Sequence, residues 1–438
     1  MTIDFFTRVF QAGKNLGEIM GEKLYYPADI MLPDFNKVSG TKWAVIACDQ
    51  FTSEPEYWQK AEEIRKDSPS TLSLIIPEGF LSEAKERIPK INAEMENYVK
   101  NVLKTYENSV IYTERIQKDG KVKHGIVCMV DLEEYDFKVG SKSLIRATEG
   151  TVLERIPPRV EIRKDAPIEL PHIMLLIDDD KKTVIEPITA KKDSLKKVYG
   201  FELMQGGGEV SGYLVDKSDF ENINTALTKI ISDENASRLY GNAPSKLLYA
   251  VGDGNHSLAT ARTCYLEIKK SLGEELAKNH PSRYALVEIV NLHDDALEFE
   301  PIYRVLFGVN VSDVLSKLKT YAKNLNGNEN PQEVEVYFEN KAEKIIFEKP
   351  EKQLTVGTLQ DFIDDYLKNN CGEVDYIHGE KVAKNLSKKQ NAMGFIFSGI
   401  EKNQLFKTVI YDGALPRKTF SIGHAYDKRY YIECRKIK

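Results

Sequence analysis

The sequence predicts an α+β protein of mixed strand and helix order, with a larger N-terminal region (residues 1–298) and a smaller C-terminal α+β region (residues 299–438) that contributes to the same site. In the stretch Lys246–Leu272, an apolar strand pattern passes through a Gly-rich turn into a helical pattern with one buried face. At Val110–Gln117 and His124–Asp131, two strand patterns flank a Lys-Asp-Gly turn, which is typical of a β-hairpin. After residue 298, a helix, a polar linker, two strands and a further helix predict the small α+β unit.

Composition narrows the class of protein. With 438 residues the chain is long enough for two or three domains, and 42% hydrophobic with 29% charged residues is typical of a soluble globular protein. The net charge of −6 argues against a general nucleic-acid-binding surface, and no apolar run approaches the length that spans a membrane. The five cysteines are scattered without a CxxC pair, which predicts reduced thiols in a cytoplasmic protein. We expect neither a nucleic-acid partner nor membrane association, and the oligomeric state stays open.

Shorter patterns predict further elements. Residues 4–20 can form an amphipathic helix, for which packing in a core or interface is favoured over membrane binding. Lys42–Cys48 is typical of a buried strand, and Asp49 follows it directly, where polar residues often line a site. The alternative is that Asp49 caps the next helix. Strands are also predicted at Thr71–Ile76 and Thr408–Ile410.

The most informative stretch is the turn Gly252–Ser257, which has the sequence GDGNHS and precedes a helix. The first turn of a helix has unpaired N–H groups and a partial positive charge, so it suits a phosphate. Gly252 and Gly254 allow a sharp turn and a close approach of a ligand to the main chain. Asp253 could hold Mg²⁺ or orient a nucleophile, and His256 could donate to a phosphate oxygen or move a proton.

An ordinary turn explains the same residues. Asn255 and Ser257 are both good helix N-caps, and Asp-Gly and Gly-Asn are common turn dipeptides. The stretch is not a Walker A loop, because the Gly-Lys-Ser/Thr ending is missing, and it is not GxGxxG either. The motif alone therefore leaves a ligand site and a structural turn as open alternatives.

Ser143–Val160 is the second unusual stretch, because Arg146, Arg155 and Arg159 lie close to Glu149 around a Pro-Pro pair. Arginines at this density can clamp phosphate groups bidentately. They can also form a surface network of ion pairs with neighbouring glutamates. From sequence alone the ion-pair network is favoured.

These residues carry a resemblance to a known family. From about residue 25 to its end, the chain resembles the bacterial and archaeal proteins catalogued as domain of unknown function 1015, which are related to the ParB/sulfiredoxin superfamily. The family's central Asp-Gly-His-His-Arg signature corresponds to Asp253–Ser257, and its Glu-x-Thr segment corresponds to Glu149–Thr151 with Arg159 nearby. Further matches are Pro301 and Arg304 after an apolar strand, Tyr376–Gly379, and, more loosely, Pro416, Lys418 and Thr419. The resemblance implies a ParB/sulfiredoxin-like core around the strand–DGNH–helix unit.

Two positions depart from the signature, since Asn255 replaces the first His and Ser257 replaces the Arg. In the superfamily that Arg commonly meets a nucleotide phosphate, so Arg159, Arg262 or Lys418 would have to substitute for it in space. The cysteine of the sulfiredoxin signature is missing, and there is no basic helix-turn-helix pattern. The resemblance therefore implies neither sulfinic acid reduction nor a DNA-partition role.

The resemblance implies nucleotide-dependent phosphoryl transfer, because free-serine kinases of the superfamily use an Asp, a His and a Glu around such a loop. Mapped by role, Asp253 would bind Mg²⁺ or align the hydroxyl, His256 would bind phosphate, and Glu149 would act as the base. The phosphate- or nucleotide-binding set would be Gly252, Gly254, Asn255, Ser257, Arg159 and Lys418. The implied cofactor is ATP or ADP with Mg²⁺, and the implied substrate is a small hydroxyl compound such as a free amino acid.

Two other functions stay open. A non-catalytic nucleotide or anion sensor is favoured by the altered Ser257, because a weakened phosphate clamp suits binding better than turnover. A scaffold whose ancestral pocket has decayed is the third possibility, since fold resemblance is a poor guide to activity.

Overall fold

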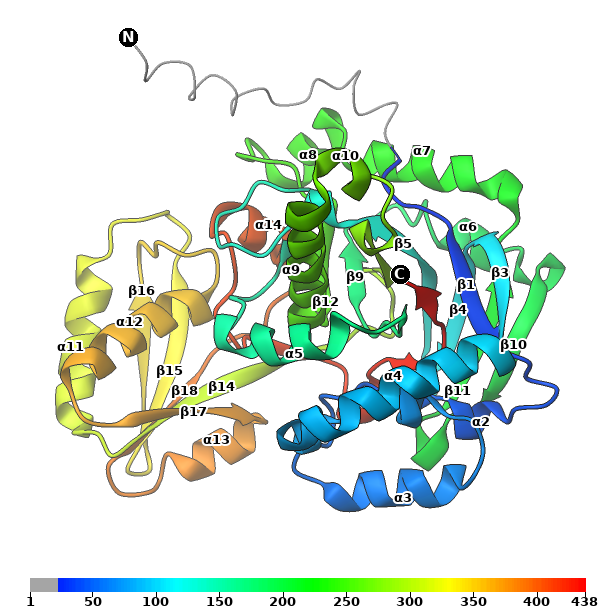
Figure 1. The fold of residues 1–438 in the computed structure, drawn as a ribbon. Coiled ribbons are helices and arrows are strands. Elements are labelled where there is room, and N and C mark those ends of the chain that lie inside the picture. The colour runs from blue at the N-terminus through cyan, green and yellow to red at the C-terminus, as the bar shows by residue number, and fades with distance from the viewer. Residues whose placement is uncertain (1–22) are drawn as a thin grey trace, which may run out of the picture.

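The computed structural model describes residues 23–438, and the amphipathic segment predicted at residues 4–20 lies outside this range. Figure 1 shows two large β-sheets, each with helices packed beside it. This combination of helices and a large mixed sheet confirms the predicted α+β class. None of the helices within residues 23–438 is long and apolar enough to cross a lipid bilayer.

The larger sheet has nine strands in the order β10-β11-β4-β5-β13-β9-β12-β7-β6. In chain order they are β4 (Ile111–Ile116), β5 (Val122–Asp131), β6 (Tyr135–Asp136), β7 (Ile145–Ala147), β9 (Met174–Ile177), β10 (Lys196–Glu202), β11 (Glu209–Leu214), β12 (Tyr249–Asp253) and β13 (Tyr284–Asn291). The strands β4 and β5 pair as the hairpin that the turn sequence predicts. The strand β9 runs parallel to β13 and antiparallel to β12, so the sheet is mixed. Its central strands are almost wholly buried, which explains their continuous apolar runs.

Helices pack against this sheet. The long helix α9 (Asn255–Leu272) contacts α5 (Ile156–Arg163), and both lie in front of the central strands in Figure 1. The buried face of α9 includes Leu258, Ala261 and Tyr265, which recur with helical spacing. The other helices of this region are α2 (Gly40–Trp43), α3 (Pro55–Arg65), α4 (Ala84–Asn101), α6 (Glu186–Thr189), α7 (Phe220–Ile230), α8 (Asp233–Tyr240) and α10 (Glu274–Ala277).

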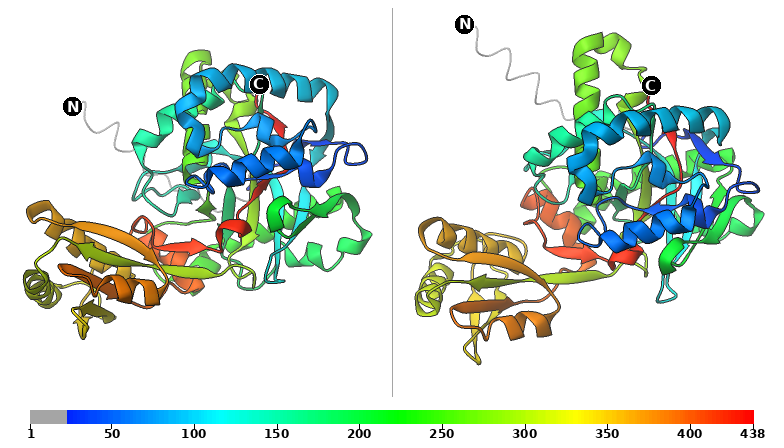
Figure 2. Two further views of the ribbon diagram at one scale, coloured as in Figure 1. Left: turned by 90° about the horizontal axis from the view of Figure 1, so that it is seen from below. Right: turned by 60° about the horizontal axis from the view of Figure 1, so that its bottom comes forward.

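The smaller sheet belongs to the C-terminal part of the chain and lies to one side of the larger sheet in Figures 1 and 2. Its strands run in the order β16-β15-β18-β14-β17, and β19 also pairs with β14. The strands are β14 (Phe299–Phe307), β15 (Gln332–Phe338), β16 (Lys341–Phe347), β17 (Glu373–His378), β18 (Ala392–Ile396) and β19 (Phe420–Ile422). Its helices are α11 (Val311–Asn324), α12 (Thr355–Asn369), α13 (Glu380–Leu386) and α14 (Lys402–Tyr411).

The last residues of the chain return to the N-terminal part. The strand β20 (Tyr430–Tyr431) pairs with β2 (Val45–Ile46), and β21 (Arg435–Lys436) pairs with β8 (Ile168–Glu169). A further pair is β1 (Ala28–Pro33) with β3 (Leu103–Ser109). This return matters for the site because it fixes the segment immediately before β20. The domain division at residue 298 stays a prediction.

The return is secured by buried ion pairs around Arg429. Its guanidinium lies 3.1 Å from Glu288 of β13 and 2.6 Å from Glu433, and all three side chains are almost fully buried. Burial raises the pKa of Glu288, but Arg429 and Lys123 outweigh it and lower the pKa to about 2. Breaking such a pair leaves an uncompensated charge in the interior, so this network holds the C-terminal segment in place.

Two predicted strands are wrong, and the strand predicted at Lys42–Cys48 is reduced to β2 (Val45–Ile46), because Gly40–Trp43 forms the helix α2. Thr71–Leu74 forms a 3₁₀ helix, because the Thr71 hydroxyl donates to the Trp43 carbonyl oxygen at 2.9 Å and side-chain bonds of this kind compete with extended pairing. Thr408–Ile410 lies inside α14, whose start is fixed by a capping box between Glu401 and Gln404. That capping signal and the packing of α14 outweigh the β-branched residues of the segment.

Candidate functional site

The loop after β12 is shaped by Gly254. The last strand residue is Asp253 and α9 begins at Asn255, so Gly254 is the N-cap, with a φ of 80°. Glycine tolerates this left-handed conformation, and a Cβ atom at the position would lie 3.0 Å from the Cα of Ile173. Since glycine has no side chain to cap the helix, the N–H groups of the first turn of α9 remain available to a ligand.

A cavity of about 470 Å³ opens at the start of α9. We call it the α9 cavity. The predicted site residues all line it, namely Glu149, Arg159, Gly252, Asp253, Gly254, Asn255, His256, Ser257 and Lys418. The fold thus brings together the loop, the arginine-rich stretch and a segment of the C-terminal part. The catalytic, phosphate-binding and metal-binding roles of these residues stay predictions.

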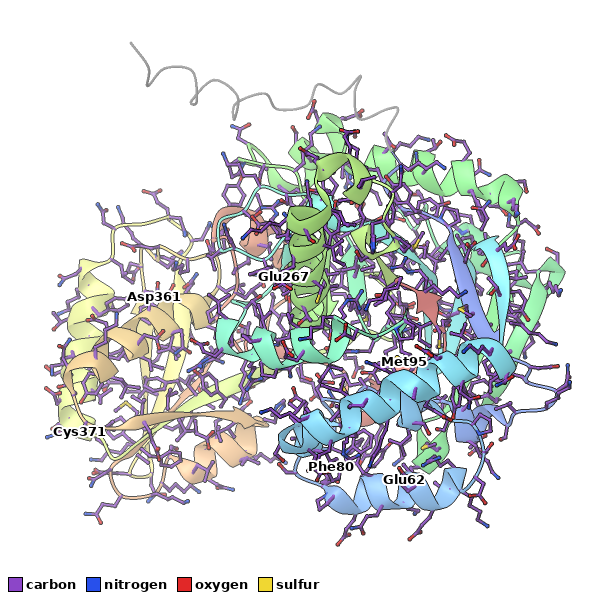
Figure 3. The ribbon with its side chains drawn as sticks, in the orientation of Figure 1. Glu62, Phe80, Met95, Glu267, Asp361 and Cys371 are labelled. Atoms are coloured by element: carbon purple, nitrogen blue, oxygen red, sulfur yellow. The ribbon has the colours of Figure 1, made fainter. Side chains whose placement is uncertain are left out.

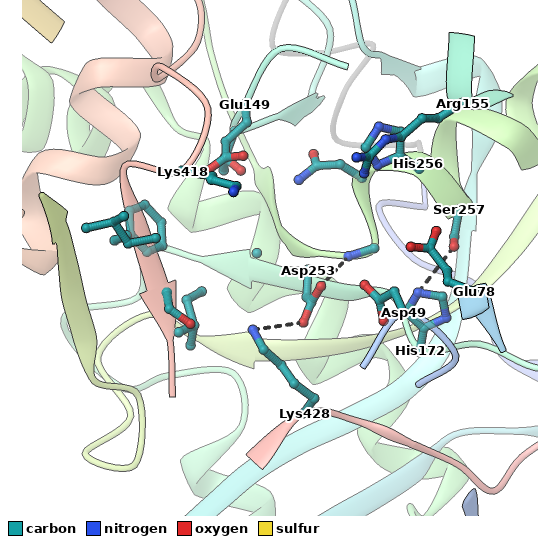
Figure 4. A pocket seen from close by; sticks show the side chains of 18 of the residues that line it. Asp49, Glu78, Glu149, Arg155, His172, Asp253, His256, Ser257, Lys418 and Lys428 are labelled. Carbon is teal, nitrogen blue, oxygen red and sulfur yellow. Dashed lines mark hydrogen bonds and ion pairs between the residues drawn. The ribbon is translucent and has the colours of Figure 1, made fainter. Parts of the chain in front are cut away.

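Asp253 is ionised and has a cation beside it. Its Oδ1 accepts a hydrogen bond from the Gly254 N–H at 2.8 Å, and its Oδ2 lies 3.3 Å from Nζ of Lys428 (Figure 4). Burial raises the pKa of Asp253, but Lys428, His172 and the Gly254 hydrogen bond together outweigh burial, and the pKa lies below its ordinary value. The carboxylate is therefore negative at neutral pH.

His256 lines the cavity and has a buried ring nitrogen without a hydrogen-bond partner among the described residues. Within residues 23–438, neither Nε2 of His256 nor Oδ1 of Asn255 has a hydrogen-bond partner, although both atoms are buried. Burial lowers the pKa of His256, and the guanidinium groups of Arg159 and Arg155 lower it further against an opposite effect of Asp49. Figure 4 shows the ring beside Arg155. A neutral imidazole with a free nitrogen, surrounded by positive charge, is suited to hydrogen-bond an anion.

The arginine-rich stretch supplies part of the positive charge. Arg159 forms an ion pair with Glu78 and donates to the Arg155 carbonyl oxygen at 2.8 Å, so the ion-pair interpretation holds for this residue although it also lines the cavity. Arg262 does not substitute for the signature arginine. It donates to the Leu132 carbonyl oxygen and does not line the α9 cavity.

Glu149 is a carboxyl group with a raised pKa. Burial raises it, and hydrogen bonds from the backbone N–H groups of Lys418 and Thr419, together with the charge of Arg304, offset burial only in part. The β-bridge between Glu149 and Leu415 holds the two chain segments together. A carboxyl group with a raised pKa in a cavity wall is a candidate general base.

Tyr376 and Arg304 hold the segment that carries Lys418. Nζ of Lys418 lies 5.1 Å from the centroid of the Tyr376 ring, and the guanidinium groups of Arg304 and Arg417 lie 5.0 Å and 5.6 Å from it. Arg304 is fully buried and donates to the carbonyl oxygens of Lys418 at 3.0 Å and Arg417 at 3.1 Å. These contacts fix the Lys418 backbone at the cavity.

Several lining residues escaped the sequence prediction, among them Glu78, His172 and Lys428. His172 precedes the apolar strand β9 and has no motif around it, yet its Nε2 lies 3.2 Å from Oγ of Ser257. Lys428 reaches the cavity only through the long-range pairing of β20 with β2. Asp49 had a local signal, since it follows a strand, and it lines the cavity.

A metal ion at this site would have few protein ligands. Within the described range 23–438, no three His, Cys, Asp or Glu side chains are grouped to hold one. Mg²⁺ in phosphate-binding sites is held by one or two carboxylates together with phosphate oxygens, so Asp253 alone fits that pattern. The Lys428 ammonium, 3.3 Å from its Oδ2, would compete with the ion.

Solved structures give partial similarity. A free serine kinase in complex with AMP is 13% identical, with a TM-score of 0.37 over 71% of this chain and 92% of that chain. A conserved hypothetical protein from Pyrococcus furiosus is 13% identical, with a TM-score of 0.35 over 72% and 97%. C-terminally truncated SbnI from Staphylococcus aureus is 9% identical, with a TM-score of 0.32 over 68% and 82%.

No curated protein matches the chain. The family described as Protein of unknown function (DUF1015) matches residues 33–366, which include the DGNH loop, Glu149 and β14. This is the family that the loop and its companion segments predicted. Since the match spans most of the sequence, the chain belongs to the DUF1015 family.

Proposed function

We propose that this protein is a nucleotide-dependent phosphotransferase that moves a phosphoryl group from ATP or ADP to the hydroxyl of a small compound, such as a free amino acid. The observation that carries the proposal is the unpaired, buried Nε2 of His256 at the start of α9, in a cavity with several cationic side chains. A buried polar atom without a partner costs about 1–3 kcal/mol, and a phosphate oxygen would remove that cost.

The phosphate groups would lie against the first turn of α9. Its N–H groups and the helix dipole favour negative charge there. His256 would donate from Nε2, and Arg155, Arg159 and Lys418 would add positive charge around the same space. Glu78 reduces the contribution of Arg159, because the two are already paired.

Glu149 would act on the substrate hydroxyl. In the transfer step, the bond between the terminal phosphorus and its bridging oxygen breaks, and a bond forms between that phosphorus and the hydroxyl oxygen. Glu149 takes the hydroxyl proton, and the shortened nucleotide leaves with the bridging oxygen. The raised pKa supports this role, because a general base works best when its pKa lies near the working pH.

Asp253 is the residue that would hold Mg²⁺ with the nucleotide phosphates. The ion, when bound, would neutralise phosphate charge. Lys428 already places a positive charge beside Asp253, so displacement of Lys428 from Oδ2 would accompany ion binding.

The finer classification rests on the same residues. We propose that the strand–DGNH–helix unit marks a ParB/sulfiredoxin-like core and that residues 299–438 form a separate unit that shares the cavity. The shared cavity is supported by Tyr376, Lys418 and Phe420, which line it together with the loop.

We also propose a cytoplasmic location, which the five cysteines without disulfides support.

The test is an activity assay on the purified protein. The protein is incubated with ATP or ADP, Mg²⁺ and a panel of hydroxy amino acids and related alcohols, and mass spectrometry is used to look for a phosphorylated product. We expect one class of hydroxyl compound to be phosphorylated with release of the shortened nucleotide. A correctly folded protein that neither binds nor consumes any nucleotide contradicts the proposal.

A non-catalytic nucleotide or anion sensor is the second candidate. The Asp253–Lys428 pair favours it, because the carboxylate that would bind the metal ion is already satisfied by a protein cation. Calorimetry separates the two functions: nucleotide binding without any phosphorylated product supports the sensor.

A further inference from the structure

Ser257 and His172 form a hydroxyl–imidazole pair in the wall of the α9 cavity. Oγ of Ser257 lies 3.2 Å from Nε2 of His172, and both residues line the cavity (Figure 4). Ser257 is the third residue of α9, so its hydroxyl sits at the positive end of an 18-residue helix. The side chains come from α9 and from the segment before β9, and only the fold brings them together.

The His172 ring is held in one orientation. Its Nδ1 lies 3.1 Å from the Tyr431 hydroxyl, and His172 is 7% exposed while Tyr431 is 3% exposed. The Tyr431 oxygen accepts a hydrogen bond from the Cys48 N–H at 3.2 Å, and its hydroxyl also bonds the Cys48 side chain. The tautomer with its proton on Nδ1 donates that proton to the Tyr431 oxygen and leaves Nε2 to accept the proton of Ser257, and this is the tautomer that the proposal requires.

We propose that the transfer takes place in two steps in place of the single direct step: Ser257 is a nucleophile that takes the phosphoryl group from the nucleotide while His172 accepts its proton, and the group then passes to the small hydroxyl compound. This proposal rests on the proposed phosphotransferase function. An adjacent base is what activates a serine hydroxyl, which is a weak nucleophile at its own pKa.

Two steps make up the relay. In the first, the bond between the terminal phosphorus and its bridging oxygen breaks, the Oγ–phosphorus bond of Ser257 forms, and the hydroxyl proton moves to Nε2 of His172. In the second, the substrate hydroxyl attacks the phosphoserine, Glu149 takes the substrate proton, and Oγ of Ser257 regains its proton from His172. The N–H groups of α9 stabilise the phosphoryl group on Ser257 between the steps.

A second Ser–His pair in the chain provides a matched control. Nδ1 of His280 lies 2.6 Å from Oγ of Ser282, but neither residue lines the α9 cavity. If a serine beside an imidazole were sufficient, both pairs would accept phosphate. If the cavity and the helix start are required, only Ser257 does.

The experiment omits the acceptor. Full-length protein is incubated with nucleotide labelled in its terminal phosphoryl group, and the protein is analysed for a covalent label, its acid stability and its position. We expect one acid-stable phosphoryl group on Ser257, together with exchange of label between the two nucleotides. Ser257→Ala should lose the label, Ser257→Thr should carry it on the threonine, and Ser282→Ala should keep it on Ser257. His172→Gln should slow labelling by about 10²–10⁴-fold with nucleotide affinity unchanged, as expected for loss of a general base.

The failures can be told apart. A phosphorylated small-molecule product that forms without any protein label or nucleotide exchange overturns the serine relay and leaves the proposed function standing. An acid-labile label, typical of phosphohistidine, or a label that persists in Ser257→Ala, also overturns the relay. If folded protein binds no nucleotide in calorimetry, the proposed function itself fails and the relay fails with it.

Discussion

Two neighbouring cavities of this protein differ in charge although they share part of their walls. The α9 cavity measures about 470 Å³ and a second cavity about 360 Å³, and both are lined by Gly150 and Tyr376. The α9 cavity has the start of a long helix, and its four cationic side chains Arg155, Arg159, Lys418 and Lys428 are matched in number by the carboxyl groups of Asp49, Glu78, Glu149 and Asp253. The second, which we call the acidic cavity, is lined by Asp361, Asp364 and Asp412 with Lys352 and Arg417.

The difference in lining charge indicates which of the two cavities suits an anion. In the acidic cavity three aspartates face two cations, so a phosphate there would meet an excess of carboxylates. In the α9 cavity, the start of the helix and the side chains of Arg155 and Arg159 concentrate positive charge around His256, whose pKa is lowered by burial and by these two arginines. Cavity size alone would not separate the two.

The largest expected effect is on turnover. Glu149→Gln removes the proposed base from the α9 cavity while keeping its shape, so product formation should fall by about 10²–10⁴-fold with nucleotide affinity retained. Steady-state kinetics and calorimetry on the same preparation measure the two quantities. The matched control is Asp361→Asn in the acidic cavity, which should leave turnover unchanged. Equal losses in both variants would contradict the contrast between the cavities.

The pH dependence of turnover tests the proposed role of Glu149 as the base. Because burial raises the pKa of Glu149, the ionised base is lost as the pH falls through a value above that of an ordinary glutamate. The rate should therefore rise with pH through that raised pKa, with a slope of about tenfold per unit on its acid side. A pH profile of kcat checks this, and in Glu149→Gln the acid limb should disappear. An acid limb that remains in the variant assigns it to another group.

A smaller effect is expected on stability when Lys428 is replaced. Lys428→Met leaves the Asp253 carboxylate partly buried without its cation, which should cost about 1–3 kcal/mol of unfolding free energy at neutral pH. In the wild type the lowered pKa of Asp253 stabilises the fold above the pKa of an unfolded aspartate, and this stabilisation is lost as the pH falls through the folded value. Urea melts at neutral and acid pH measure the difference in unfolding free energy between the wild type and Lys428→Met, and this difference should be smaller at acid pH. A difference that is constant with pH contradicts the pairing.

The smallest effect should come from the acidic cavity. The Asp361 side chain is half-exposed, with Oδ2 3.6 Å from Nζ of Lys352, so Asp361→Asn should change stability by no more than about 0.5 kcal/mol. Its nucleotide affinity should equal that of the wild type. Thermal melts measure the stability, and calorimetry measures the nucleotide affinity. Weaker nucleotide binding in this variant would show that the nucleotide binds in the acidic cavity and not in the α9 cavity.

Part of the site could be predicted from sequence because it is local. The strand and the helix of residues Lys246–Leu272 follow directly from a buried apolar run, a Gly-rich turn and helical spacing, whereas the expected N-caps Asn255 and Ser257 are wrong, because Gly254 holds that position. Glu149 and Arg159 were identified through the resemblance to the family, because the crowded charges around the Pro-Pro pair favoured a surface ion-pair network. The hairpin of β4 and β5 likewise follows from one short turn.

The rest could not be predicted, because it depends on pairings between distant segments. Lys428 reaches Asp253 through the return of the chain to β2, and His172 meets Ser257 only because β9 and β12 are neighbours in the sheet. The strand pattern at Thr408–Ile410 misled for a different reason, since a local capping box and the packing of α14 outweighed its β-branched residues. Arg262 was a reasonable substitute for the signature arginine, but it turns towards the carbonyl of Leu132.

Calorimetric titration of ATP into wild type and His256→Ala tests whether the α9 cavity binds phosphate through His256. The matched control is His424→Ala, since His424 is exposed and does not line the cavity. We predict that His256→Ala folds normally and loses about 1.5–3 kcal/mol of binding free energy, the scale of a hydrogen bond to a charged group. That loss is about tenfold to a hundredfold in affinity, with the control unchanged. Equal ATP affinity in wild type and His256→Ala would show that the loop does not hold the ligand and would contradict the account.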